Sequence, residues 1–329
     1  MNWTVKRASE AAAEAFIAIT LAFFLTKFMP GNPIQNLIIT YLEQGYSYQQ
    51  AVEMASTLIG YNVNTPIWLQ YVQYIEGVFT GHLGVSIYYR VPVVTLLGIA
   101  LPWTLFLVVT SLLLAYLTGI TLGIVLGMSK GKRREGPLNV TFSVLSGIPN
   151  YIVATLLWIF LTYRYHLFPT GGSYSTSAGT FSLTNISFLG DVLYHYALPI
   201  VSFWITLIPG WILSMKSSVV SVLKDDFITV AKARGVRGTR MTWTYVGRNA
   251  MLPIITGLPL AFAGLIGGAV FIENIFSLTG VGYYLYSAIG GRDYPLALGF
   301  FLFLILLVIL GNLIMDLTYQ FIDPRVKMR

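Results

Sequence analysis

The pentapeptide at 127–131, GMSKG, has the GxSxG spacing that holds a nucleophilic serine in many hydrolases. That chemistry requires the serine to lie on a turn between a strand and a helix, with a histidine base within reach. Here the pattern lies between a long apolar run and a cluster of basic residues. Ser129 is therefore expected at the end of a helix, where it would not act as the nucleophile of a hydrolase.

Metal and phosphate chemistry are also poorly supported. The histidines His82, His166 and His195 are scattered without HExxH spacing, and the sequence contains no cysteine. The Gly-Lys pair at 131–132 is followed by Arg133, where a phosphate-binding loop needs Ser or Thr. The sequence therefore predicts no catalytic residue, no metal site and no resident cofactor, and the chain is not expected to be an enzyme.

The densest group of charges lies between Lys232 and Arg248, where five Lys and Arg residues fall within seventeen positions. Before it, an apolar residue at every fourth position predicts an amphipathic helix, which Gly235 would end. A second helix is expected from about Thr239 toward Pro253, where an apolar run starts. The repeated apolar positions of the first helix are Val219, Leu223, Phe227 and Ala231.

Two interpretations of this stretch remain open from the residues alone. An interfacial helix whose basic residues meet anionic lipid explains the charge. It does not explain the small residues Ala231, Ala233 and Gly235, which would let another backbone approach closely.

The composition shows which elements must position this stretch. The chain of 329 residues is 56% hydrophobic and 10% charged, whereas a soluble domain has roughly 25% charged residues. About 20 apolar residues cross a bilayer as a helix, and six runs reach that length. The sequence thus predicts an all-α integral membrane protein with six transmembrane helices. The runs cover about 11–29, 101–128, 140–163, 192–215, 252–275 and 296–317.

The positive charges predict the orientation of these spans. Sixteen of the twenty Lys and Arg residues fall on one side if the N-terminus is cytoplasmic, which places both termini in the cytoplasm of a plasma-membrane protein. All three histidines then lie across the membrane from Ser129, which removes the base that a serine hydrolase would need. The net charge of +7 is explained by the Lys and Arg residues on one side of the membrane and does not indicate a nucleic-acid partner.

The segment between the first two spans is too long for a simple turn and is expected to fold outside the membrane. Ser47 could cap an amphipathic helix, and the stretch IWLQYVQYIEGVF reads as a second helix on the outer surface. The expected segments are 1–29 for the N-terminus and first span, 30–95 for this helical insertion, 96–317 for a transmembrane domain that contains the basic loop at 218–250, and 318–329 for a cytoplasmic tail.

Small and special residues inside the spans predict how they pack. Gly119, Gly123 and Gly127 recur every four residues, so they form one small-residue face that allows close helix packing in lipid. Pro199 and Pro209 remove backbone donors from the fourth span and predict bending there.

The chain resembles the permease subunits of binding-protein-dependent ATP-binding-cassette importers, in the form typical of the dipeptide and oligopeptide family. The resemblance extends over nearly the whole chain. Its strongest part is TVAKARGVRGTRMTWTYVGRNAMLPIIT, which is similar to the EAA loop of these permeases. Further stretches occur in the family's order: KFMPGNP, GHLGVSIYYRVPV, LPIVSFW, ENIFSLTGVGYYLYSAIGGRDYPLALG and DLTYQFIDPRVK.

The resemblance implies a type I importer permease (MetI-like) fold and a set of partners. These are a second homologous permease, two ATPase subunits and an extracytoplasmic substrate-binding protein, in addition to membrane lipid. In the family the EAA helix docks in a groove of the ATPase. Thr229 stands where the general motif has Glu, so a contact made by that acidic group does not carry over. The matching positions are Asp226, Thr229, Val230, Ala231, Lys232, Ala233, Arg234 and Gly235.

The expected function is therefore that of a transport subunit that forms the pathway for a peptide or a similar small oligomeric solute. Relatives that import oligosaccharides or nickel leave the substrate open, and periodicity does not show which residues line the pathway. The alternative is an ATP-independent channel or secondary carrier whose basic loop binds lipid.

Overall fold

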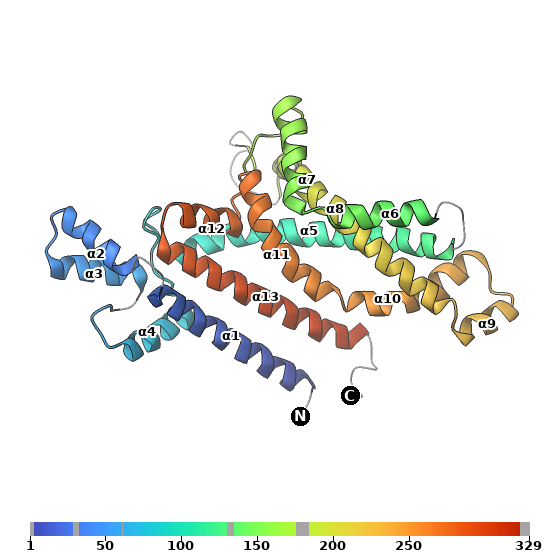
Figure 1. The fold of residues 1–329 in the computed structure, drawn as a ribbon, viewed down its shortest axis with the longest axis horizontal. Coiled ribbons are helices and arrows are strands. Elements are labelled where there is room, and N and C mark those ends of the chain that lie inside the picture. Colours follow the sequence, from blue (N-terminus) through green and yellow to red (C-terminus); the bar gives the residue numbers. More distant parts are fainter. Residues whose placement is uncertain (1–2, 29–32, 61, 130–134, 176–183, 323–329) are drawn as a thin grey trace. The chain divides into compact units, whose positions relative to one another are not determined.

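The computed structural model describes residues 3–28, 33–60, 62–129, 135–175 and 184–322. Within these ranges the regular elements are helices, with one isolated bridge between Val85 and Pro92 (Figure 1). The chain divides into two compact units, which are described separately. The first comprises Met1–Thr104 and Thr279–Leu313, and the second Leu105–Leu278 and Ile314–Arg329.

The first unit contains the two helices that were predicted between the first two spans. Ser47 caps α3 through a capping box, in which Gln50 N donates to Ser47 Oγ and Ser47 N donates to Gln50 Oε1. The helices of this unit are α1 (Trp3–Phe28), α2 (Pro33–Glu43), α3 (Tyr48–Ile59), α4 (Ile67–Thr80), the start of α5 (Val93–Met128), α12 (Val281–Gly290) and the start of α13 (Tyr294–Ile322).

Helix α4 is held against α1 by aromatic side chains. The ring of Phe23 lies 5.4 Å from that of Tyr71 and 5.5 Å from that of Tyr74, and Phe23 is fully buried. A hydrogen bond of 2.7 Å joins Thr20 Oγ1 to the Tyr71 hydroxyl. The helical segment between the first two spans therefore packs against the first span.

A buried carboxylate connects two parts of the first unit that are far apart in the sequence. Asp293 is 2% exposed and accepts hydrogen bonds from Ser86 Oγ at 2.5 Å, from Tyr88 N at 3.1 Å and from Leu296 N at 3.3 Å. Burial raises the pKa of the Tyr89 hydroxyl in the same loop, and the neighbouring Tyr284 raises it further. Asp293 thus fixes the loop before α5 to the start of α13.

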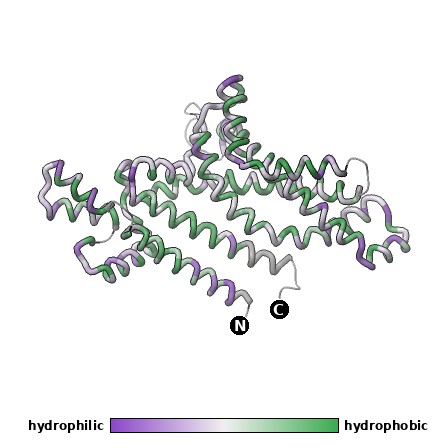
Figure 2. The backbone as a smooth tube through the Cα atoms, viewed as in Figure 1, coloured by the Kyte–Doolittle hydropathy of each residue, from purple (hydrophilic) through white to green (hydrophobic). Residues whose placement is uncertain are grey.

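The second unit carries the remaining helices and the basic loop. Figure 2 shows hydrophobic residues along α5 and α8 and hydrophilic ones around α9. The elements are the rest of α5, α6 (Glu135–Ser146), α7 (Asn150–Leu157), the π-helical segment η1 (Trp158–Arg164), α8 (Ile186–Val222), α9 (Asp226–Ala233), the π-helical segment η3 (Arg240–Gly247), α10 (Arg248–Ile255), α11 (Leu258–Ile275) and the end of α13.

Five described helices are long and apolar enough to cross a membrane, and a sixth span exists if one bent pair is counted as a single span. The chain is thus an all-helical, multi-pass membrane protein. The predicted third span is this pair, which bends by 88° between Ser146 and Asn150. Pro149 explains the break, because proline cannot donate to the preceding turn and moves the residue before it out of the helical conformation. By contrast, α8 runs without interruption through Pro199 and Pro209.

The three glycines of α5 face α8. A Cβ added to Gly123 would lie 2.6 Å from the Cβ of Met215 and 2.9 Å from the carbonyl oxygen of Ile212. A Cβ at Gly127 would lie 2.5 Å from a methyl carbon of Val219, and one at Gly119 would collide with Trp211. These positions have no room for a side chain while the two backbones keep this approach.

Replacing Gly123 with alanine should therefore destabilise the second unit by about 1–3 kcal/mol, the usual cost of overpacking a filled core. Part of the obstruction is backbone, so a rotamer change cannot relieve it. The measurement is the thermal unfolding midpoint of the detergent-solubilised chain. Gly98→Ala in the same helix is the matched control, because a Cβ there meets open space. Equal midpoints for the two variants would contradict close packing at Gly123.

Candidate coupling site

The site is built around α9, an eight-residue helix that follows the C-terminal end of α8 in the sequence. The turn after Val222 includes Leu223, and Asp225 adopts an extended conformation from which α9 starts at Asp226. The prediction of one continuous helix through this region was wrong, because the turn interrupts it. Asp226 in the first turn and Lys232 in the last turn match the helix dipole, which stabilises so short a helix.

Gly235 ends α9, as the sequence predicted. Its φ of +78° lies in the left-handed region. Its N–H donates to the carbonyl of Lys232 at 3.0 Å, and the N–H of Val236 donates to that of Ala231 at 3.1 Å. This pair of bonds is the Schellman motif, which glycine adopts without strain. A Cβ at Gly235 would meet nothing of this chain within 4 Å, so the backbone conformation explains the glycine here and intrachain crowding does not.

Helix α9 has an inner and an outer face. Ile228 is fully buried and Ala231 is 3% exposed, whereas Phe227 is 41% and Val230 49% exposed. The sequence periodicity placed Phe227 on the buried face, which is wrong because the turn at 223–225 resets the helical phase. Ile228 takes the buried position. The site residues that lie exposed are Asp226, Thr229, Val230, Lys232, Ala233, Arg234 and Gly235.

Ala231 differs from the other expected site residues. Its side chain packs inside the chain's own core, so it is not available to contact a partner in this conformation. Its small size instead allows α9 to lie close to the elements beneath it. Ile228, which sequence reasoning did not select, has the same position in the core.

One apolar core joins α9 to two membrane spans. Besides Ile228 and Ala231, it includes residues of α5, α8, η3 and α10. Tyr116, Trp211 and Val236 lie against it. Helix α9 therefore packs directly against the ends of α5 and α8. The further buried members are Ile120, Ile124, Met215, Val219, Met241, Val246, Ala250 and Ile254.

The return from α9 toward the membrane is fixed to the same helices. Ser218 Oγ of α8 donates a 2.7 Å hydrogen bond to the carbonyl of Ala250 in α10. A Cβ at Gly247 would lie 3.1 Å from the Cδ1 of Ile124, so η3 lies tightly against α5. The expected fifth span begins later than predicted, because a break at Thr256 and Gly257 separates α10 from α11.

Exposed apolar and basic side chains occur along α9 and the turn that follows it. Lys232, Arg234 and Arg237 are exposed, and no ion pair or hydrogen bond of their side chains occurs among the described residues. They lie in the sequence around Phe227 and Val230, which are the exposed apolar side chains of α9. A partner with an apolar groove and an acidic rim would match this surface.

The other patterns considered in the sequence do not form a second chemical site. Gly127 of the GxSxG pattern packs against Val219, and residues 130–134 lie outside the described residues. His195 Nδ1 lies 2.9 Å from the Asp191 carbonyl oxygen in the same helix. Within the described ranges no three His, Cys, Asp or Glu residues gather in a way that could hold a metal ion.

Comparison with known proteins gives a consistent result. Residues 119–328 match the family described as "Binding-protein-dependent transport system inner membrane component". The oligopeptide transport system permease protein OppB of Haemophilus influenzae is 30% identical over 329 residues, which cover 99% of each chain. The dipeptide transport system permease protein DppB is 28% identical in Lactococcus lactis over the full length of both chains, and 29% identical in Escherichia coli K12 over 95% of each.

The two faces of α9 predict different responses to the same kind of truncation. Ile228→Ala should leave a cavity in the shared core at a cost of about 2–5 kcal/mol, whereas Val230→Ala on the exposed face should be nearly neutral in the isolated chain. Hydrogen exchange of the α9 amides measures the difference. Similar exchange in both variants would contradict the assignment of inner and outer faces.

Proposed function

Because this chain belongs to the family of binding-protein-dependent transport system inner membrane components, we propose that it is the permease subunit of an ATP-driven importer in which α9 is the coupling helix. As in its relatives, the chain is a transport component and not an enzyme. The observation that carries the proposal is that α9 has one face in a core shared with α5 and α8, while its apolar residues Phe227 and Val230 are exposed.

The proposed assembly has this chain paired with a second, homologous permease above two ATPase subunits, and a binding protein on the outer side delivers the solute. Both termini and the loop at 218–250 lie in the cytoplasm, and the segment 30–95 lies outside. The distribution of Lys and Arg supports this orientation. The remaining boundaries, 1–29, 96–317 and 318–329, follow from the same topology.

The proposed mechanism is mechanical. Movement of the ATPase subunits on nucleotide binding displaces the outer face of α9, whose Phe227 and Val230 form the contact. Because Ile228 and Ala231 belong to the same core as Met215 and Ile124, the displacement tilts α8 and α5 with it. The glycine face of α5 keeps these two spans in close contact during that movement.

We assign a peptide as the proposed substrate. Support comes from relatives aligned over nearly the whole chain, which are named as oligopeptide and dipeptide permeases. An ATP-independent channel or carrier would need no ATPase at α9, so stable copurification of ATPase subunits with this chain distinguishes the two functions.

The orientation predicts which positions a membrane-impermeant maleimide can reach in intact cells. The chain has no cysteine, so single cysteines report cleanly. Gln49→Cys, at the exposed start of α3, should be labelled from outside, whereas Thr244→Cys, exposed on η3, should be labelled only after the membrane is opened. External labelling of position 244 would contradict the orientation and, with it, the coupling role of α9.

The coupling role predicts that a change on the exposed face of α9 reduces substrate-stimulated ATP hydrolysis but leaves membrane insertion intact. Val230→Asp places an unpaired charge on the proposed contact and should reduce substrate-stimulated ATP hydrolysis of the complete transporter at least about fivefold, since allosteric couplings are typically worth 5–150-fold. Thr244→Asp, which adds the same charge elsewhere in the cytoplasmic loop, is the control. Membrane insertion of both variants should equal that of the parent chain. Normal stimulation with Val230→Asp would contradict the coupling role of α9.

A further inference from the structure

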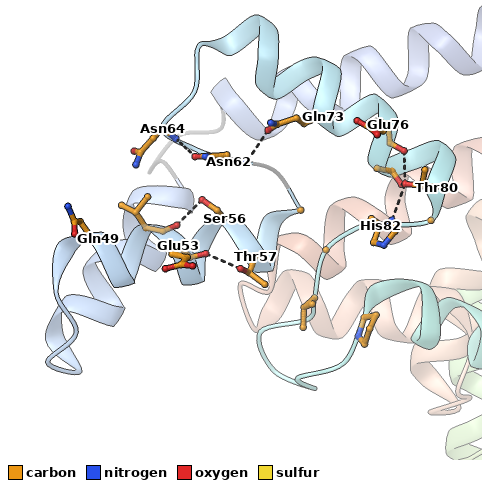
Figure 3. A pocket seen from close by; sticks show the side chains of 17 residues that line it. Gln49, Glu53, Ser56, Thr57, Asn62, Asn64, Gln73, Glu76, Thr80 and His82 are labelled. Atoms are coloured by element: carbon orange, nitrogen blue, oxygen red, sulfur yellow. Dashed lines mark hydrogen bonds between the residues drawn. The ribbon is translucent and has the colours of Figure 1, made fainter.

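The first unit contains a polar cleft of about 1030 Å³ between α3, α4 and the loop that follows α4. Figure 3 shows Gln49, Glu53, Ser56 and Thr57 on the α3 side and Gln73, Glu76 and Thr80 on the α4 side. The volume is at the upper end of the roughly 300–1,000 Å³ that holds small ligands. The described residues that line it include no Phe, Tyr or Trp.

The base of the cleft is rigid because backbone builds it. The N–H of Val85 donates to the carbonyl of Leu58 at 2.9 Å, and the N–H of His82 donates to that of Gly77 at 2.7 Å. A Cβ at Gly77 would lie 2.8 Å from the carbonyl oxygen of His82, and the left-handed Gly60 is similarly confined. The cleft is therefore preformed, and binding there would cost little ordering of the chain.

The polar side chains of the cleft divide into two groups. The hydroxyls donate to the backbone of their own helices: Thr57 Oγ1 donates to the carbonyl of Glu53 at 3.0 Å, and Thr80 Oγ1 donates to that of Glu76 at 2.8 Å. The carboxylates of Glu53 and Glu76 have no hydrogen bond or ion pair in the described part of the chain. The amide oxygen of Gln73 accepts from Asn62 N at 3.1 Å, which leaves its NH2 group to donate.

The charge around the cleft is unusual for this protein. The whole chain carries a net charge of +7, yet the sixty residues from Pro30 to Tyr89 contain three carboxylates and no Lys or Arg. Two of the three, Glu53 and Glu76, line the cleft. Arg90 follows this segment, between the lining residues Val85 and Pro92, but no ion pair joins it to either carboxylate among the described residues. Both carboxylates would therefore attract a cation from outside the chain.

We propose that this cleft binds a short, positively charged peptide, with Glu53 and Glu76 accepting from its ammonium groups and side-chain amides donating to its carbonyl oxygens. The inference rests on the proposed orientation, which exposes the cleft on the side from which the solute arrives. The carboxylates of the two helices supply acceptors from opposite sides, and the confined backbone beneath them fixes the spacing (Figure 3).

The test uses the full chain in lipid nanodiscs without ATPase subunits, labelled at Gln49→Cys with an environment-sensitive fluorophore. The probe is a short lysine-containing peptide, and its comparison is the same peptide with glutamine for lysine and an acetylated amino terminus. The cationic peptide should bind, and added salt should weaken it. The Glu53→Gln and Glu76→Gln double variant should lower its affinity about tenfold, as the loss of two exposed ion pairs would.

Glu43→Gln is the matched control, because Glu43 is an exposed carboxylate on α2 that does not line the cleft. It should leave the affinity unchanged. Equal binding of the neutral peptide, no binding of the cationic one, or an equal loss with Glu43→Gln would overturn the proposal. Because the readout is binding to the single chain, its failure would leave the coupling role of α9 untouched, and the failure of coupling would leave this binding measurable.

Discussion

The arrangement of the second unit depends on one apolar contact, the insertion of Ile228 and Ala231 of α9 into a core made by the ends of α5 and α8. Lipid supplies no hydrophobic drive for spans to associate with one another, so close packing and hydrogen bonds must hold them. Outside the hydrocarbon the situation differs, because burial of apolar side chains from water is favourable. Helix α9 lies beyond the predicted span, so the burial of Ile228 and Ala231 from water can stabilise the packing of its inner face.

Within the spans, small residues and hydrogen-bonded polar groups hold the helices together. The glycines at 119, 123 and 127 bring the backbone of α5 onto α8. Trp204 Nε1 donates to Thr118 Oγ1 at 2.9 Å between the same helices, and Lys216 Nζ, largely buried, donates to Asn139 Oδ1 of α6 at 2.7 Å. Each polar group of these pairs would be costly in lipid if it were unpaired. Helix α8 is thereby joined to α5 and α6 along much of its length.

Much of this organisation could be predicted from the sequence, because it follows from local rules. Hydropathy located the spans, Ser47 and Gly235 marked helix ends, and the spacing of the α5 glycines defined one face. The errors arose where tertiary packing decides. The inner face of α9 could not be assigned from a four-residue period, because a three-residue turn after Val222 interrupts the helix. The turn shifts the helical phase, so that Ile228 is buried where the period predicted Phe227. The proline at 149 was a signal for the break in the third span, but the angle of the break depends on neighbours that periodicity does not describe.

The strength of the α9 core determines how a force on this helix is transmitted. Removing the side chain of one fully buried residue such as Ile228 costs about 2–5 kcal/mol, and the core contains several such residues. The coupling between two sites of an allosteric protein is typically about 1–3 kcal/mol. A partner that supplies only the smaller energy cannot detach α9 from α5 and α8, so the lower-energy response is for the three helices to move together. The outer face can then change its partner contacts while the inner face stays packed, which is the property that a coupling element requires.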